Sequence, residues 1–304
     1  MIETLPIQVS PHVTLSCRAS GPPDAPAIVF VHGFPEAAFV WDPLLEHFGA
    51  RWRCIAPNLR GYAGSSAPEA VEAYRARPLV ADLCGLIDQL GGRVAAVVAH
   101  DWGGALAWAL AALHPDKLER LVIVNSPHPA TFLRELRDNP QQQRASAYMT
   151  FLCRPDAEAL LAENDFARLW GFFTAMGAAD AAHPGGGWLD EATRERYREV
   201  WRQGLRGACN YYRASPLRPP TAPTDAVMTL QLPAELVNVR VPTRVVWAEG
   251  DAALPPALLD GLEAWVPDLQ VVRVPQATHW IVHERPERIV HEVEQSLAAL
   301  TAGR

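Results

Sequence analysis

Runs of consecutive apolar residues recur along the chain, and helical patterns separate them. The run Ala27–Val31 is typical of a strand buried on both faces of a parallel sheet. Further strands are predicted at 54–56, 94–98, 121–124, 244–247 and 269–274, with a leading antiparallel hairpin at 7–9 and 13–16. Strands that alternate with helices predict an α/β fold, here a mostly parallel sheet of about eight strands with helices on its faces.

The pattern changes between Pro129 and Ala222. Buried strand runs are absent from this part of the sequence, and helical patterns dominate, for example at 156–169 and 191–203. The stretch 177–187 is rich in Ala and Gly and predicts a loop. We therefore expect a helical insertion in the sheet domain.

The Pro-rich stretch 215–223 suits an extended return from this insertion to the sheet. The expected organisation is one α/β core domain formed by residues 1–129 and 223–304, interrupted by a helical cap at 130–222. The length of 304 residues fits one catalytic domain with a lid better than two independent domains.

The composition is that of an ordinary globular protein, with 49% hydrophobic and 20% charged residues. The formal net charge is −7, and the basic residues are scattered, so neither nucleic acid nor an anionic membrane surface is an expected partner. No stretch approaches the length of about 18 apolar residues that a membrane span needs, and the first residues lack the pattern of a signal peptide. We therefore expect a cytoplasmic protein that is a monomer or a homodimer.

The cysteines suggest neither a disulfide framework nor a zinc site, because they are odd in number and contain no CxxC pair. They are Cys17, Cys54, Cys84, Cys153 and Cys209, and we expect them to fill space in the core. His279 and His283 have the spacing of a metal-binding pair on a helix, but no third ligand accompanies them. No metal and no cofactor is expected.

Candidate chemistry begins where the apolar run at 94–98 leads through a tight turn into an Ala-rich helix. Asp101 occupies the tip of this turn, where a G-x-S-x-G elbow carries its serine, and Gly103 and Gly104 supply the small neighbours that such a turn needs. An aspartate is already ionised at neutral pH and attacks an electrophilic carbon without a base, which gives an ester with the enzyme. The alternative is that Asp101 only caps the following helix.

Two further side chains leave predicted strands at the same edge of the sheet. Asp251 follows the strand at 244–247, and His279 follows the strand at 269–274. Ligand sites of open α/β sheets lie at this edge, and the order nucleophile, acid, histidine is that of an α/β-hydrolase. Glu249 lies two residues before Asp251 and is the alternative acid.

The loop after the first buried strand, His32-Gly33-Phe34-Pro35-Glu36, completes this candidate site. Gly33 tolerates turn conformations that aim the following backbone N–H groups into a site. The N–H of Phe34, together with that of Trp102 beside the candidate nucleophile, would form an oxyanion hole. The alternative is an ordinary loop between a strand and a helix.

Five motifs together resemble the epoxide hydrolases of the α/β-hydrolase fold superfamily, which are related to haloalkane dehalogenases. They are HGFPE at 32–36, NLRGYAGSS at 58–66, AHDWGG at 99–104, AEGD at 248–251 and ATHW at 277–280. The resemblance covers 27–298 and implies Asp101 as nucleophile, His279 as base and Asp251 as its charge partner. It also implies Phe34 and Trp102 as oxyanion donors and a cis Phe34–Pro35 bond.

The resemblance further implies two cap tyrosines that bind the epoxide oxygen. Tyr212, in the segment CNYYR, matches the first. Tyr148 is our choice for the second, although its distance from Pro155 departs from the family pattern, in which Phe151 would align. Additional substrate contacts are expected from Pro35, Trp280 and Phe151.

The expected reaction is the hydrolysis of an epoxide to a vicinal diol through a covalent ester on Asp101, with a small-molecule epoxide and water as the only partners. Detoxification is the role that the family suggests. A haloalkane or fluoroacetate dehalogenase, which uses the same aspartate, is the first alternative. Phe34 and Trp102 stand, however, where haloalkane dehalogenases have Asn in the oxyanion loop and fluoroacetate dehalogenases have Arg after the nucleophile. The remote alternative is a small-molecule receptor without activity on this fold.

Overall fold

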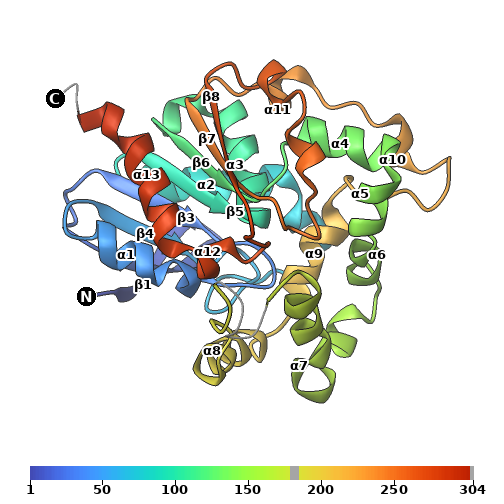
Figure 1. Cartoon of the computed structure of the whole chain (residues 1–304). Helices are drawn as coiled ribbons and strands as arrows, with labels where there is room; N and C mark the ends of the chain where they lie inside the picture. The colour runs from blue at the N-terminus through green and yellow to red at the C-terminus, as the bar shows by residue number, and fades with distance from the viewer. Residues whose placement is uncertain (179–184, 302–304) are drawn as a thin grey trace.

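The computed structural model describes residues 1–178 and 185–301 and contains one sheet of eight strands (Figure 1). The strands are β1 (Glu3–Ser10), β2 (Val13–Ser20), β3 (Ala27–Val31), β4 (Arg53–Pro57), β5 (Ala96–His100), β6 (Leu121–Val124), β7 (Thr243–Ala248) and β8 (Leu269–Val274). Their order across the sheet is β1-β2-β4-β3-β5-β6-β7-β8. β2 is antiparallel to β1 and to β4, and all other pairs are parallel. The predicted α/β sheet with its leading hairpin is confirmed.

Helices cover both faces of the sheet. The helices of the core are α1 (Asp42–Phe48), α2 (Ala76–Gln89), α3 (Asp101–Leu113), α10 (Ala226–Thr229), α11 (Ala234–Val237), α12 (Ile281–Glu284) and α13 (Pro286–Thr301). α1 and α13 pack together in front of the sheet in Figure 1, and α2 and α3 pack together behind it. The central strands β3, β5 and β6 are buried along their whole length because both faces are covered.

The first six helices after β6 gather on one side of the molecule (Figure 1). They are α4 (Pro129–Asp138), α5 (Pro140–Ala145), α6 (Tyr148–Leu152), α7 (Ala157–Ala175), α8 (Glu191–Trp201) and α9 (Arg206–Ala214). No strand interrupts them within the described residues, and the cap boundaries at 130 and 222 stay a prediction. Residues 179–184 of the predicted loop at 177–187 lie outside the described residues.

One helix of this region departs from the sequence pattern. The periodicity predicts an unbroken helix over 156–169, but α7 is interrupted at 163–166, where Asn164, Asp165 and Phe166 have positive φ angles. Phe166 is buried and packs on Trp201, whose ring centre lies 5.3 Å away. Local helix propensity alone does not predict this interruption of α7. The packing of Phe166 on Trp201 accompanies it.

Helix α8 is anchored on the loop that follows β3. The indole of Trp201 donates to the backbone oxygen of Pro35 at 2.8 Å, and the Tyr197 hydroxyl donates to buried Glu36 at 2.8 Å. Arg196, the residue before Tyr197, forms an ion pair with Asp42 at 2.5 Å. Each contact joins the inserted helices to the segment 34–42 of the core.

The junction between β5 and α3 is a tight turn beside the loop that follows β3. Asp101 has a φ of 48°, a left-handed conformation that a non-glycine residue seldom adopts. Its neighbours must be glycines, because a Cβ on Gly33 would lie 2.3 Å from the Cβ of Asp101, and one on Gly103 would lie 2.4 Å from the carbonyl oxygen of Val31. The turn predicted from the small neighbours of Asp101 is therefore confirmed.

We expect Gly103→Ala to destabilise the fold by about 1 to 3 kcal/mol, because the added methyl group collides with the backbone of β3. Gly171→Ala is the matched control, since Gly171 lies in α7 with nothing within 4 Å of the new Cβ. That change should be neutral or stabilising by up to about 1 kcal/mol. Urea unfolding of both variants measures the difference, and equal midpoints would contradict the assignment of the close contact.

Candidate active site

The left-handed turn holds the Asp101 carboxylate at the carboxyl edge of the sheet. Its side chain is 13% exposed, and Oδ1 accepts a hydrogen bond of 2.7 Å from the backbone N–H of Phe34. The Phe34–Pro35 bond is cis, as the sequence predicts. One carboxylate oxygen is thus bound to the predicted oxyanion loop, and the other is left for a different partner.

His279 and Asp251 meet at the same edge. Nδ1 of His279 lies 2.7 Å from Oδ2 of Asp251, and Nε2 lies 3.8 Å from Oδ2 of Asp101. Asp251 is fully buried and accepts further hydrogen bonds from the backbone N–H groups of Ala253 and Leu254. The three predicted side chains therefore form one chain of contacts.

The alternative acid lies elsewhere. The Glu249 side chain is 38% exposed and pairs with Arg273 of β8 at 3.5 Å. Asp251, and not Glu249, is hydrogen-bonded to the imidazole of His279.

Burial and neighbouring charges shift the pKa values of His279 and Asp251 in opposite directions. Burial alone would lower the pKa of His279, but the neighbouring carboxylates of Asp251, Asp101 and Glu36 outweigh it and raise the pKa to about 9. Burial would likewise raise the pKa of Asp251, but His279 and hydrogen bonds from Asn125 and the backbone hold it below its ordinary value. Asp251 is therefore ionised, and its charge favours the protonated imidazole.

Tyr148 of α6 and Tyr212 of α9 lie over Asp101 and line the same cavity. Their ring centres are 6.0 Å apart, and the ring of Trp102 meets that of Tyr212 edge-on with the ring centres 5.1 Å apart. Burial raises the pKa of both phenols far above the ordinary value, so both are neutral O–H donors at physiological pH. The structure thus brings the two tyrosines chosen from the sequence together with Asp101.

The cavity has a volume of about 240 Å³. Trp102, Ala105 and Leu106 of α3 line it beside the tyrosines, and apolar side chains from α2, α4 and α11 complete its walls. Among the described residues that line it, Asp101 is the only charged one. Such a cavity favours an uncharged ligand that presents one electrophilic or hydrogen-bonding centre to Asp101.

Comparisons with known proteins agree with this geometry. A family model described as alpha/beta hydrolase fold matches residues 26–286. The chain belongs to this family. A Bacillus subtilis relative, AB hydrolase superfamily protein YfhM, is 36% identical over 90% of this chain and 91% of its own length. Epoxide hydrolase 3 of Xenopus tropicalis is 32% identical over 89% of this chain and 71% of its own length.

Solved structures extend the agreement to three dimensions. A protein described among novel epoxide hydrolases of the alpha/beta hydrolases superfamily from hot-environment metagenomes superimposes with a TM-score of 0.87, at 36% identity, over 98% of this chain and 99% of its own. The Bacillus megaterium epoxide hydrolase, solved with an inhibitor, gives a TM-score of 0.86 at 28% identity, over 97% of this chain and 100% of its own.

Three residues of this chain that the sequence predicts to contact substrate do not line the cavity above Asp101. Trp280 is fully buried, and its indole donates to a backbone oxygen of α7 at 2.9 Å. Pro35 is buried, and its carbonyl is bound by Trp201. Phe151 is half-buried and is likewise not among the residues that line the cavity. Packing between the insertion and the core occupies Trp280 and Pro35, and the role of all three as substrate contacts stays a prediction.

The sequence analysis missed a second group of residues, although Glu36 lies in the HGFPE motif and His100 in the AHDWGG motif. The buried Glu36 accepts hydrogen bonds from the Tyr197 hydroxyl at 2.8 Å and from His283 at 2.7 Å, and its other oxygen lies 3.2 Å from His100. The opposite nitrogen of His100 donates to the backbone oxygen of His279 at 2.9 Å. Burial opposes ionisation of Glu36, but its histidine partners hold its pKa below the usual range.

Asn125 was also missed. It follows β6 with a φ of 38°, and its amide donates to Oδ2 of Asp251 at 2.8 Å. Its position directly after a buried strand was the available signal, since polar residues at this edge of a parallel sheet point to the ligand site.

The described residues contain no group of three or more His, Cys, Asp or Glu side chains that could hold a metal ion. His283, which has metal-like spacing to His279, instead binds Glu36 and stacks on Trp188 with ring centres 4.0 Å apart. None of the helices in residues 1–178 and 185–301 is long and apolar enough to cross a membrane.

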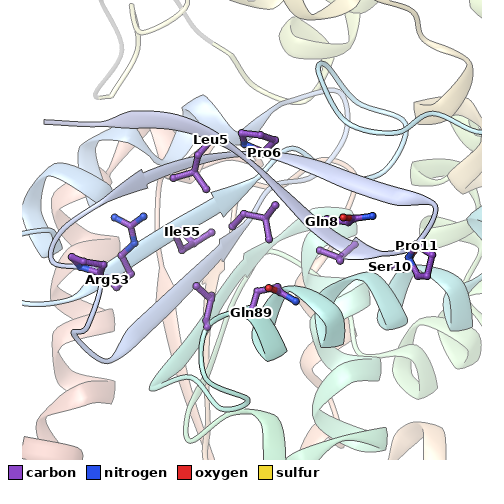
Figure 2. Close-up of a pocket in the computed structure, with 12 residues that line it drawn as sticks. Leu5, Pro6, Gln8, Ser10, Pro11, Arg53, Ile55 and Gln89 are labelled. Atoms are coloured by element: carbon purple, nitrogen blue, oxygen red, sulfur yellow. The ribbon is translucent and has the colours of Figure 1, made fainter.

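A second hollow of about 790 Å³ lies beside the outermost strand β1, between the leading hairpin, β4 and α2 (Figure 2). It is lined by Leu5, Gln8, Arg53 and Gln89 among others, and by none of the predicted site residues.

We expect the imidazole of His279 to titrate with a pKa of about 9, and Asp251→Asn to lower that pKa because the main compensating charge is lost. Since the folded pKa exceeds the ordinary 6.5, the stabilisation from this proton is complete below pH 6.5 and is lost as the pH rises through about 9. NMR of the imidazole carbons measures it, with the His279→Gln variant to assign the signal. A pKa at or below 6.5 would refute the charge balance described above.

Tyr197→Phe should destabilise the fold by about 1 to 3 kcal/mol, because buried Glu36 loses one of its hydrogen-bond donors. Tyr62→Phe is the matched control, because the Tyr62 hydroxyl is also buried but has no hydrogen-bond partner in the described part of the chain. That change should be neutral or stabilising. Urea unfolding of both variants compares them, and an equal loss would contradict the contribution of the Glu36 contact.

Proposed function

We propose that this protein is an epoxide hydrolase that converts an uncharged epoxide and water into a vicinal diol. The observation that carries the proposal is the pair of neutral tyrosine hydroxyls, Tyr148 and Tyr212, in one cavity with the side chain of Asp101. An epoxide needs a nucleophile at carbon and donors at its oxygen at the same time. Relatives named epoxide hydrolases support the same reaction.

In the first step, the Asp101 oxygen that does not bind Phe34 attacks a ring carbon, and the carbon–oxygen bond of the ring breaks. The ring oxygen takes a proton from one tyrosine while the other tyrosine hydrogen-bonds to it. The product is a hydroxyalkyl ester of Asp101. Neutral phenols suit this step because a phenolate has no proton to donate.

In the second step, His279 accepts a proton from water, and the resulting hydroxide attacks the Asp101 ester carbon. Charge develops on Oδ1, which the N–H of Phe34 stabilises, and the N–H of Trp102 is proposed as the second donor. The intermediate expels the diol oxygen, which takes the proton from His279. The carboxyl proton left on Asp101 then passes to His279, which restores the carboxylate and the protonated imidazole.

Formation of the ester also prepares His279 for its task. The Asp101 carboxylate is one of the charges that raise the pKa of His279, and esterification removes that charge. The pKa of His279 therefore falls in the intermediate, so the imidazole gives its proton to the tyrosinate left by the first step and becomes a base. Asp251 keeps the Nδ1–H oriented and stabilises the imidazolium that forms.

The first alternative, a dehalogenase, uses the same nucleophile but has to stabilise a departing halide. The Phe34 side chain offers no N–H for a halide, and a tyrosine pair with raised pKa values suits protonation of an alkoxide better than solvation of a halide. The second alternative, a receptor without activity, does not explain why Asp101, His279 and Asp251 contact one another.

We expect His279→Gln to accumulate the covalent ester, because the first step does not require the base and the second does. Intact-mass spectrometry after mixing with styrene oxide should show an increase equal to the mass of the epoxide. Asp101→Ala is the control and should show no adduct and no turnover. The absence of an adduct in the His279 variant, or halide release without diol formation in a panel of haloalkanes and epoxides, would refute the proposal.

A further inference from the structure

The cavity extends well beyond the site of reaction. On α3, the residues that line it are Asp101, Trp102, Ala105, Leu106 and Ala109. Their spacing of four residues places them in one stripe along the helix. Eight residues separate Asp101 from Ala109, which corresponds to ~12 Å of helix. The cavity is therefore a groove that starts at the nucleophile and follows α3.

Small side chains form the part of this groove that lies on α3. Ala105 and Ala109 keep it open because their side chains end at Cβ, and Phe132 and Leu236 also line the cavity.

The groove also contains no charge apart from its catalytic end. Its lining beyond Asp101 consists of apolar side chains and neutral hydroxyl groups from the described residues. A charged substituent placed there would lose its hydration without gaining a partner. An alkyl chain would instead gain transfer free energy with each methylene group that enters.

We propose that the substrate is an oxirane carrying an uncharged alkyl chain of about octyl length, which lies along α3 and ends at Ala109. This inference rests on the proposed function for the placement of the oxirane at Asp101, and adds the substituent that the remainder of the site accepts. Ala109 is then a residue that determines specificity for chain length.

The test measures kcat/KM for a series of terminal epoxides from propylene oxide to dodecene oxide. We expect an increase of about threefold to fourfold for each methylene up to the octyl substituent of decene oxide, followed by a plateau. Replacing the terminal methyl group of the hexyl member by a carboxylate should lower kcat/KM at least ~10-fold, because the charge is buried without a partner. A series without an increase, or one that keeps rising to the decyl substituent of dodecene oxide, overturns the inference.

Ala109→Leu shortens the groove and should lower the ratio of octyl to ethyl kcat/KM about tenfold. Ala112→Leu is the matched control, because Ala112 lies on the same helix and does not line the cavity. It should leave the whole series unchanged. If Ala109→Leu shifts the plateau no more than Ala112→Leu does, the assignment of Ala109 is wrong.

A binding experiment separates this inference from the proposed function. Calorimetry with terminal diols of increasing chain length measures the affinity of the groove for an alkyl chain without any turnover. If no epoxide is hydrolysed but diol affinity rises to octyl and Ala109→Leu shortens that rise, the groove stands and the proposed reaction is wrong. If epoxides are hydrolysed but neither kcat/KM nor diol affinity depends on chain length, the reaction stands and the groove is wrong.

Discussion

The left-handed conformation of Asp101 is the constraint on which the rest of this site depends. A carboxylate can project from the end of β5 only if the chain reverses direction within one residue, and that reversal requires the β3 loop and α3 to approach without side chains between them. Gly33 and Gly103 permit the approach. The same proximity brings the N–H of Phe34 to the carboxylate, so one backbone geometry serves both the nucleophile and its oxyanion donor.

Two buried carboxylates flank this turn, and each is stable only because donors surround it. Asp251 is bound by His279, Asn125 and backbone N–H groups, and Glu36 is bound by Tyr197 and two histidines. The free-energy cost of burying an ionised carboxylate is large unless such partners compensate it. The carboxylates that favour the protonated imidazole of His279 are therefore held in place by groups of the protein and not by solvent.

Much of this arrangement could be predicted from the sequence. The buried strands appear as continuous apolar runs, and Asp101, Asp251 and His279 follow such runs at one edge of the sheet, which is a local signal. The Tyr197–Glu36 contact has no such signal, because it joins positions 161 residues apart through packing. The burial of Trp280 and the interruption of α7 are likewise decided by tertiary contacts.

The anchoring of α8 has a consequence for protein engineering. Its bonds from Trp201 to Pro35 and from Tyr197 to Glu36 end on the loop that also orients the Phe34 N–H. The inserted helices are thus not a module that can be exchanged between relatives at the ends of the insertion alone. A chimaera that imports a foreign insertion would need to import the 34–42 loop with it, because the two segments share one set of hydrogen bonds although β3 and α8 are far apart in the chain.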